Sequence, residues 1–223
     1  MDATAIIPVK RFPAAKQRLL DMLDRPQRAA VLKAMLADVL DAVGDAELVD
    51  RVIVVTGEGR AERIALGKAK RMGTYVEVLR DPDDAGHPQA ATLGIIRALA
   101  LGAECVALLP GDCPLVDSGE LDAALGRMAP GRVAVAPDRH GSGTNALLLS
   151  PADAIAPGFG PDSRERHLER ARARGMDAAV EELESLALDL DTPDDLAALR
   201  DALEANPQRA PATAEAFREL PRR

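Results

Sequence analysis

Two apolar runs that lead into aspartates constrain the fold of this chain more than any other feature. Residues 105–109 are followed by Pro110-Gly111-Asp112, and residues 186–190 contain Asp189 and lead into Asp191. A parallel strand that is buried on both faces has such an apolar sequence, and ligands of open α/β sheets bind beyond the carboxyl ends of the strands. We therefore expect the three aspartates to meet at one edge of a parallel sheet.

The remaining sequence alternates between short apolar runs and amphipathic helical patterns. Strands are predicted at residues 3–9, 51–55, 74–79, 105–109, 132–136, 145–150 and 186–190. Helices are predicted at residues 26–43, 58–72, 90–101, 118–128, 161–174 and 193–204. This alternation indicates βαβ units, so the predicted fold class is α/β, with a Rossmann-like mixed sheet flanked by helices.

The length of 223 residues suits one sizeable α/β domain, which we place at residues 1–205. Thr192-Pro193 is typical of an N-cap followed by proline at the first helical position, and it starts the last predicted helix. From Asn206 the sequence is rich in proline, alanine and charged residues and has little periodicity. Residues 206–223 are therefore expected to form a loose or appended C-terminal tail.

Composition excludes several classes of protein. The formal net charge is −8 and the pI is near 5.0, so a basic face for a nucleic-acid backbone is not expected. One Tyr, three Phe and no Trp leave few rings that could stack on bases. No run approaches the roughly 20 apolar residues of a membrane span, and the cysteine usage suits a reducing compartment. We expect a cytoplasmic protein that binds neither nucleic acid nor a membrane.

The aspartates are candidate metal ligands. Asp189 and Asp191 are two residues apart, so on a regular strand their side chains would point to the same face. Asp112 could complete the site from a neighbouring strand. Magnesium prefers carboxylate oxygens together with substrate phosphates, so this grouping favours metal-assisted phosphoryl or nucleotidyl transfer. The alternative is that each aspartate is a solvated loop acid or a helix cap.

Basic residues follow the first predicted strand, at Lys10, Arg11, Lys16 and Arg18. In doubly wound folds this loop approaches the nucleotide, so these side chains could neutralise a triphosphate in an otherwise acidic protein. The alternative is an ordinary solvated basic face. The sequence contains neither a Gly-rich P-loop nor a G-x-G-x-x-G motif, which excludes an ATPase cradle and a dinucleotide fingerprint.

Two glycine-containing segments are candidate anion-binding corners, at residues 141–145 and 159–163. Glycine lets the backbone approach a ligand closely, and the second segment opens a helix whose free N–H groups favour a phosphate or a carboxylate. The alternative is plain hairpin and capping chemistry. His87, His140 and His167 lack metal-ligand spacing, so surface or capping roles are expected for all three.

Five ordered motifs between about residue 3 and residue 205 resemble one family, the 2-phospho-L-lactate/phosphoenolpyruvate guanylyltransferases of coenzyme F-420 biosynthesis. The motifs are Ile6–Lys10 with Ala15–Leu19, Pro110–Leu115, Gly143–Leu147, Phe159–Ser163 with Arg166-His167, and Asp189–Leu196. The resemblance implies a nucleotidyltransferase fold related to the GT-A glycosyltransferases. It also implies transfer of GMP from GTP to phosphoenolpyruvate or 2-phospho-L-lactate, with release of pyrophosphate.

The resemblance assigns roles to particular residues of this sequence. The positions that match the family's Mg²⁺ ligands are Asp112, Asp189 and Asp191. The positions that match its phosphoacid-binding residues are Thr144, Gly160 and Ser163. With Asp112, the residues expected to act in catalysis are Lys10 and Lys16, which fall in a motif similar to the family's triphosphate-binding loop. A transient contact with the downstream transferase is also implied.

One motif departs from the family pattern. Where the family commonly has Leu-Asn before the helix that follows the third strand, this chain has Pro88-Gln89. The amide of Gln89 offers both a donor and an acceptor, so it could replace the contact to the base or ribose. Two alternatives stay open: a nucleotidyltransferase of the same fold that uses CTP or a sugar phosphate, and a non-catalytic nucleotide-binding domain. The missing G-x-G-x-R loop counts against the first, and the complete aspartate set against the second.

Overall fold

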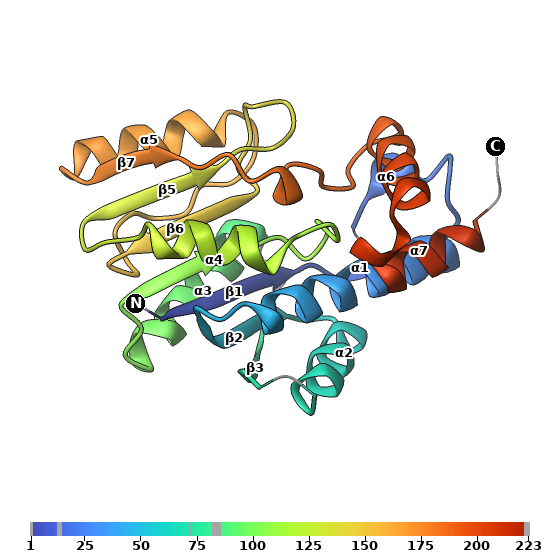
Figure 1. Ribbon diagram of the computed structural model, residues 1–223, viewed down its shortest axis with the longest axis horizontal. Coiled ribbons are helices and arrows are strands. Elements are labelled where there is room, and N and C mark those ends of the chain that lie inside the picture. The colour runs from blue at the N-terminus through green and yellow to red at the C-terminus, as the bar shows by residue number, and fades with distance from the viewer. Residues whose placement is uncertain (1, 13–14, 72, 82–85, 221–223) are drawn as a thin grey trace.

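The computed structural model describes residues 2–12, 15–71, 73–81 and 86–220. In this described part, seven strands form one sheet in the order β3-β2-β1-β4-β6-β5-β7 (Figure 1). The strands are β1 (Ala3–Val9), β2 (Val49–Thr56), β3 (Tyr75–Arg80), β4 (Cys105–Leu108), β5 (Arg132–Ala136), β6 (Ala146–Ser150) and β7 (Asp177–Val180). β6 is antiparallel to β4 and β5, whereas the other pairs are parallel. The predicted mixed sheet is confirmed.

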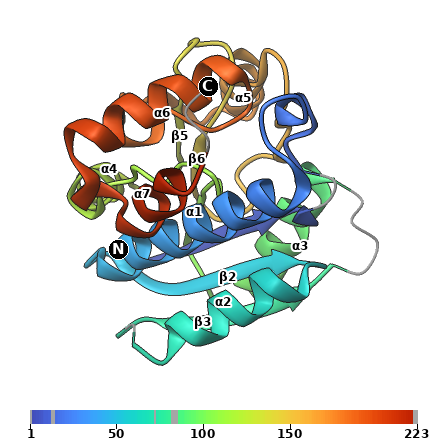
Figure 2. The same cartoon turned by 90° about the vertical axis from the view of Figure 1, so that its right-hand side faces the viewer.

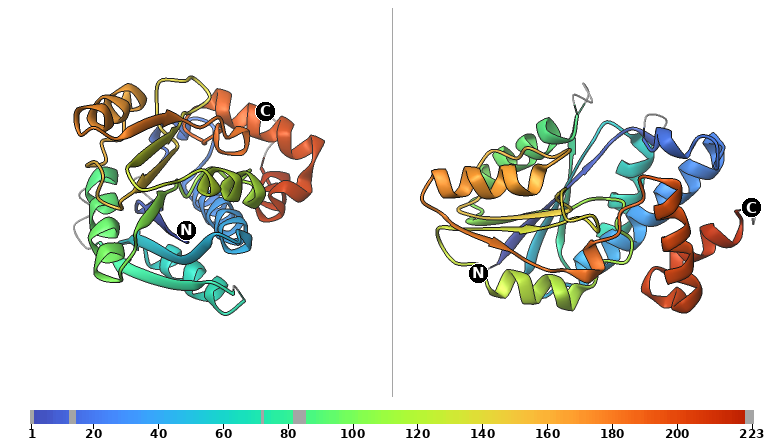
Figure 3. Two further views of the ribbon diagram at one scale, coloured as in Figure 1. Left: turned by 60° about the vertical axis from the view of Figure 1, so that its left-hand side comes forward. Right: turned by 90° about the horizontal axis from the view of Figure 1, so that it is seen from above.

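Helices cover both faces of the sheet. They are α1 (Arg25–Asp45), α2 (Gly59–Ala69), α3 (His87–Ala100), α4 (Ser118–Gly126), α5 (Ser163–Ala173), α6 (Pro193–Ala205) and α7 (Pro211–Arg218). α3 and α5 pack on one face, and α1, α2 and α4 pack on the other (Figure 3). Three short 3₁₀ helices are also described: η2 (Gln17–Leu19), η3 (Glu184–Leu186) and η4 (Pro207–Arg209). Of the predicted helix at residues 58–72, residue 72 lies outside the described residues.

The central strands are largely apolar because both of their faces are buried. On β1, Ala5 and Ile7 join the core under α1, whereas Ile6 joins the core under α3. Side chains of a strand alternate between the two faces of its sheet, so a run without polar residues fills both cores. Gly94 lets α3 approach β1 closely, since a Cβ at this position would lie 2.3 Å from a methyl carbon of Ile6.

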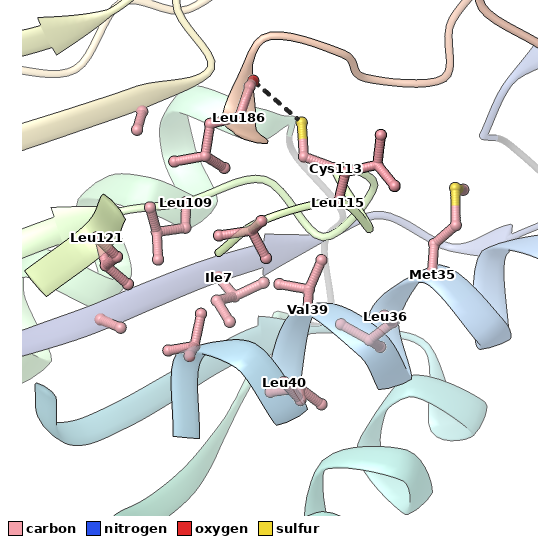
Figure 4. Close-up of a cluster of buried hydrophobic side chains, with 14 of the residues drawn as sticks. Ile7, Met35, Leu36, Val39, Leu40, Leu109, Cys113, Leu115, Leu121 and Leu186 are labelled. Carbon is pink, nitrogen blue, oxygen red and sulfur yellow. Dashed lines mark hydrogen bonds between the residues drawn. The ribbon is translucent and has the colours of Figure 1, made fainter. Parts of the chain in front are cut away.

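The core under α1 also positions the segments that follow the strands. Figure 4 shows Met35, Leu36, Val39 and Leu40 of α1 facing Ile7 and the segment after β4. In that segment, the Cys113 thiol lies 3.6 Å from the carbonyl oxygen of Leu186. The contact brings the loop that carries Asp112 beside the segment that carries Asp189.

The predicted strand at residues 186–190 is wrong. Leu186 ends η3, and residues 187–192, all of them described, form no strand. Leu186 and Leu190 are buried in the core, which explains the apolar sequence. The backbone is held by other means: the carbonyl of Ala187 accepts from Arg139 N at 2.8 Å and from Asn145 Nδ2 at 3.1 Å. The edge strand that the prediction missed is β7, which is too short and too exposed to show a clear pattern.

Of the expectation of a loose or appended tail, the loose alternative is wrong for residues 206–220. α7 packs against the outer side of α1 (Figure 2), η4 contacts α6 and α7, and Phe217 and Leu220 are buried in the same core as α1. The carboxylate of Asp38 accepts hydrogen bonds from Ala212 N at 3.0 Å and from Thr213 N and Oγ1 at 2.7 and 2.6 Å. A carboxylate from α1 therefore caps the free N–H groups at the start of α7.

Two features of the helices bear on earlier expectations. The start of α6 is as predicted, with Thr192 as N-cap and Pro193 at the first helical position. None of the described helices combines the length and the apolar character that crossing a membrane requires. Residues 221–223 of the predicted tail lie outside the described part.

Candidate active site

A cavity of about 540 Å³ opens where β1 and β4 end. The sequence-predicted residues that line it are Lys10, Lys16, Asp112, Thr144, Gly160, Asp189 and Asp191. They come from five segments that are far apart in the sequence. The carboxyl ends of β1 and β4 therefore bring the two lysines and Asp112 to the site, as open α/β sheets generally do, whereas Thr144, Gly160, Asp189 and Asp191 reach it from other segments.

Lys16 links two of the aspartates. Its ammonium Nζ forms ion pairs with the carboxylate of Asp112 and, at 2.6 Å, with Oδ1 of Asp191. The Lys16 side chain is only 8% exposed. Burial alone would lower its pKa, but Asp112 and Asp191 raise the pKa of the ammonium above its usual range. Lys16 is therefore a fixed positive charge between two carboxylates.

A buried arginine holds the loop that carries this lysine. Lys16 has a φ of 56°, a left-handed conformation that is uncommon for a residue with a side chain. Arg28 of α1 donates from Nη1 to the carbonyl oxygens of Ala15 at 2.9 Å and Lys16 at 3.5 Å. Because Arg28 is itself 2% exposed, these contacts anchor the loop directly to α1.

Asp189 carries a strongly perturbed carboxylate. Its Oδ1 lies 3.3 Å from Nδ2 of Asn145, which also donates to the carbonyls of Leu186 and Ala187. Burial and the negative charges of Asp112 and Asp191 raise the pKa of Asp189 to about 6. Near neutral pH the Asp189 side chain is therefore negatively charged, and the carboxylates of Asp112 and Asp191 repel that charge.

Asp191 is fixed by the start of α6. Its backbone N donates to Oδ2 of Asp195 at 3.0 Å, and the same oxygen accepts from Thr192 N at 2.6 Å. The other oxygen of Asp195 pairs with Arg139 at 2.7 Å. Asp189 and Asp191 therefore line the cavity together, but from a segment that is not a strand and that leads into the capped start of α6. The prediction that a regular strand aligns the two side chains is wrong.

Asp112, Asp189, Asp191 and the two lysines form a charged cluster, and its net charge bears on whether it could hold a cation. Among the described residues, no three His, Cys, Asp or Glu side chains are already grouped as the ligands of a metal ion would be. Three ionised carboxylates against the ammonium groups of Lys16 and Lys10, which lines the same cavity, leave a formal charge of −1. This excess, together with oxygen-only donors and the raised pKa of Asp189, fits a hard divalent cation.

The two expected anion-binding corners differ. In the first, Ser142 N and Gly143 N donate to Oδ1 of Asp138 at 3.1 and 3.0 Å, so these amides already hold a carboxylate of the protein. The expectation of a ligand site at residues 141–143 is therefore wrong, although Thr144 lines the cavity. In the second, Gly160 lines the cavity with a φ of 118°, a conformation that favours glycine.

Ser163 reaches the cavity through another residue. It is fully buried at the start of α5, and its Oγ lies 3.1 Å from Oγ1 of Thr144. Thr144, which lines the cavity, therefore connects the buried end of α5 to the cavity.

Comparison with known proteins gives the family. Residues 3–201 match the family described as "Guanylyl transferase CofC like". The chain belongs to this family. A relative from Conexibacter woesei, named phosphoenolpyruvate guanylyltransferase, is 45% identical over 206 residues, which cover 91% of this chain and 89% of the relative. A relative from Phenylobacterium zucineum, named 3-phospho-D-glycerate guanylyltransferase, is 38% identical over 86% of this chain and 87% of its own.

Solved structures place this chain in the nucleotidyltransferase fold. A protein from Desulfovibrio desulfuricans G20, described as a nucleotide-diphospho-sugar transferase, superposes with a TM-score of 0.72 at 18% identity. The match covers 98% of this chain and 95% of that protein. The expected GT-A-like nucleotidyltransferase architecture is thereby confirmed.

Sequence reasoning missed two histidines of the CofC-like guanylyl transferase. His87 lines the cavity, and its ring lies edge-on to Phe159, with centroids 4.6 Å apart. Burial, aided by Lys10 and Lys16, lowers the pKa of His87 to about 4. His167 is fully buried, so only His140 is exposed as expected. The signal for His167 was its position four residues after Ser163, which puts both on one face of α5.

Gln89, the residue that departs from the family pattern, also lines the cavity, beside His87 at the start of α3. The thiol of Cys113, in contrast, is buried, and burial raises its pKa well above the usual value. A protonated, inaccessible thiol is a poor nucleophile.

Proposed function

We propose that this CofC-like guanylyl transferase transfers GMP from GTP to phosphoenolpyruvate, with release of pyrophosphate, in the biosynthesis of coenzyme F-420. One observation carries the proposal: the Lys16–Asp112–Asp191 cluster and Thr144 line the same cavity. The cluster suits a triphosphate with its cation, and the Thr144 end suits a small anion. The relative from Conexibacter woesei, which carries this activity in its name, supports the choice of acceptor.

The reaction needs alignment and charge neutralisation more than proton transfer. The phosphate of phosphoenolpyruvate is largely ionised near pH 7, so one of its oxygens can attack the α-phosphorus of GTP without a general base. A new P–O bond forms, and the bond between the α-phosphorus and the bridging oxygen breaks. Pyrophosphate then leaves with the electron pair. Lys10 and Lys16 would neutralise the β- and γ-phosphates. To do so, Lys16 would exchange its contacts with the two carboxylates for contacts with the phosphates.

Asp112, Asp189 and Asp191 would hold Mg²⁺, because their oxygen donors and uncompensated charge fit a hard divalent cation. When bound, the metal supplies neutralisation of the triphosphate charge. Asn145 and Asp195 keep two of these carboxylates oriented toward the cavity. Gln89 would contact the base or ribose of GTP from the start of α3.

Thr144 and Gly160 would bind the acceptor, with Ser163 acting through Thr144. A second acceptor, 3-phospho-D-glycerate, is favoured by the name of the relative from Phenylobacterium zucineum. It shares a carboxylate and a phosphate on three carbons with phosphoenolpyruvate and 2-phospho-L-lactate. We place the reaction in the cytoplasm, with a transient contact to the transferase that consumes the product.

The test measures pyrophosphate release by the purified protein with Mg²⁺. Each of the four nucleoside triphosphates is combined with phosphoenolpyruvate, 2-phospho-L-lactate or 3-phospho-D-glycerate. We expect release with GTP and phosphoenolpyruvate. Release with another acid alone would correct the acceptor, and silence across all combinations from a folded protein that binds GTP would overturn the proposed function.

A further inference from the structure

His167 lies in a buried position behind the proposed acceptor-binding end of the cavity. It sits one helical turn after Ser163 in α5 and is fully buried. Its ring nitrogens have one partner each: Nδ1 lies 3.1 Å from Oγ1 of Thr144, and Nε2 accepts from the backbone N–H of Gly158 at 2.8 Å. Phe159 packs edge-on against the ring, with centroids 5.3 Å apart.

These contacts define where the imidazole proton lies. A backbone N–H can only donate, so Nε2 of His167 must be the unprotonated acceptor. Burial, together with the positive charges of Arg170 and Arg166, lowers the pKa of His167 to about 4, so the ring is neutral near pH 7. The single ring proton is therefore on Nδ1 and is donated to Thr144.

The remaining hydrogen-bonding capacity of the Thr144 hydroxyl is that of a donor. A hydroxyl has two acceptor lone pairs and one proton to donate. One lone pair accepts from Nδ1 of His167, and the other accepts from Oγ of Ser163, whose partner among the described residues is this same oxygen. The proton of Thr144 is thus free for a ligand in the cavity that this residue lines.

We propose that His167 is a positioning residue that, together with Ser163, fixes the Thr144 hydroxyl as a hydrogen-bond donor to the anionic acceptor. The inference rests on the proposed function, since it takes the ligand at Thr144 to be the phosphoacid. A carboxylate or an ionised phosphate can only accept, so a hydroxyl whose acceptor positions are already filled and whose proton is left to donate is matched to it. Fixing the direction before binding removes the entropy cost of orienting the hydroxyl.

Two single variants separate this role from a purely structural one. His167→Asn places an amide nitrogen at the position of Nδ1, so it keeps the donor to Thr144 and loses the acceptor for Gly158. His167→Gln places its amide at the position of Nε2, so it keeps the acceptor for Gly158 and loses the donor to Thr144. Both remove the ring from Phe159, which makes them matched controls for packing.

Steady-state kinetics of pyrophosphate release compare the variants, with phosphoenolpyruvate and GTP varied separately. We expect His167→Gln to raise KM for phosphoenolpyruvate about three- to tenfold, the effect of one lost hydrogen bond, and to leave KM for GTP within about twofold. His167→Asn should stay within about twofold of the wild type for both substrates. The opposite order, equal changes in both KM values, or no change in either variant would overturn the proposal.

Thr144→Val provides a second route should either variant of His167 fail to fold. It removes the hydroxyl on which the histidine acts, so it should raise KM for phosphoenolpyruvate while Thr144→Ser restores it. In the Thr144→Val background, His167→Gln should have no further effect on this KM. An additive effect in the double variant would show that His167 acts through another residue.

Isothermal titration calorimetry with phosphoenolpyruvate as the probe makes the comparison without turnover. Binding about three- to tenfold weaker in His167→Gln than in His167→Asn supports the positioning role even in a protein that releases no pyrophosphate. Equal binding by the two variants overturns this role alone. Absence of phosphoenolpyruvate binding by the wild type overturns both proposals.

Discussion

Asp189 bears charge that the protein alone does not balance. Asp112 and Asp191 both pair with Lys16, whereas Asp189 is paired with the neutral amide of Asn145. Its folded-state pKa of about 6 lies above the ordinary value of 3.8. The folded state therefore holds this proton more tightly than the unfolded state, and stability falls as pH rises through this interval. Above pH 6, where Asp189 is ionised, the loss of folding stability caused by its charge is complete.

Asp189→Asn is expected to remove both the destabilisation caused by the ionised carboxylate and the enzymatic activity. With a chelator present, its Tm at pH 7.5 should exceed that of the wild type by about 2–4 °C, and the difference should disappear near pH 4. Pyrophosphate release should be abolished, since one proposed metal ligand is lost. Thermal unfolding and turnover check the two parts, with the exposed Asp201→Asn as control. Normal turnover by the Asn variant would remove Asp189 from the proposed metal site.

Arg28 offers a test of the Lys16 loop. Arg28→Met removes the bonds that anchor the carbonyls of Ala15 and Lys16 while it keeps much of the side-chain volume. We expect KM for GTP to rise about three- to tenfold, because the lysine that would meet the triphosphate is less well placed. KM for phosphoenolpyruvate should be unchanged. Arg25→Met, on an exposed position of the same helix, is the matched control, and equal effects of both variants would contradict the anchoring role.

At the scale of elements, the edge strand β7 is held by ion pairs. Glu181, directly after β7, accepts from Arg127 at 2.6 Å and from Arg132 at 3.1 Å. Burial opposes ionisation, but the two guanidinium groups hold the pKa of Glu181 below its ordinary value near 4.5. A depressed carboxyl pKa stabilises the fold above the unfolded value, and this contribution is lost as pH falls through the folded value.

Glu181→Gln should therefore lower Tm at pH 7 by about 2–4 °C. The gap to the wild type should begin to narrow below about pH 4.5 and should close once the wild-type carboxyl is protonated. Thermal unfolding at a series of pH values measures this gap. Glu182→Gln, at the exposed neighbouring position, should leave Tm unchanged at every pH. A gap that is constant with pH would show that the ion pairs do not stabilise β7.

The elements that sequence predicted best are those with local signals. β1, β5 and the start of α6 were predicted because a nearly continuous apolar run, or an N-cap followed by proline, lies within a few adjacent residues. Residues 186–190 misled because burial, not pairing, makes them apolar. β7 was missed because its pairing with β5 depends on residues more than 40 positions away.

The features of the candidate site likewise divide into those that sequence motifs predicted and those that depend on contacts between distant residues. Family motifs named Lys10, Lys16, Thr144 and the three aspartates, and the fold brings them to one cavity. The ion pairs of Lys16 could not be predicted, since they join residues far apart in the sequence, 175 positions in the case of Asp191. Nor could the capture of the Ser142 and Gly143 amides by Asp138, which depends on the exact path of the turn. Roles of these residues in catalysis stay predictions.

At the scale of the whole molecule, the last described helix completes the core around the first. Phe217 of α7 is 5% exposed, so Phe217→Ala should lower Tm by about 5–15 °C through the cavity it leaves. The residues that line the cavity lie outside α7, and kcat/KM should therefore stay within about twofold of the wild type. Differential scanning calorimetry and the pyrophosphate assay measure both, with the exposed Arg218→Ala as control. Loss of activity in a folded Phe217→Ala protein would show that α7 is coupled to the site.

The cap that Asp38 provides to α7 joins residues 175 positions apart, and this separation has a consequence during synthesis. A growing chain emerges from the ribosome with α1 early, whereas α7 follows only after every strand of the sheet has been made. Until then, the outer side of α1 lacks its cover and the Asp38 carboxylate lacks its donors. An apolar helix surface exposed for that interval favours self-association. The nascent protein is thus most exposed to aggregation at its first helix, and a holdase chaperone would find its binding surface there.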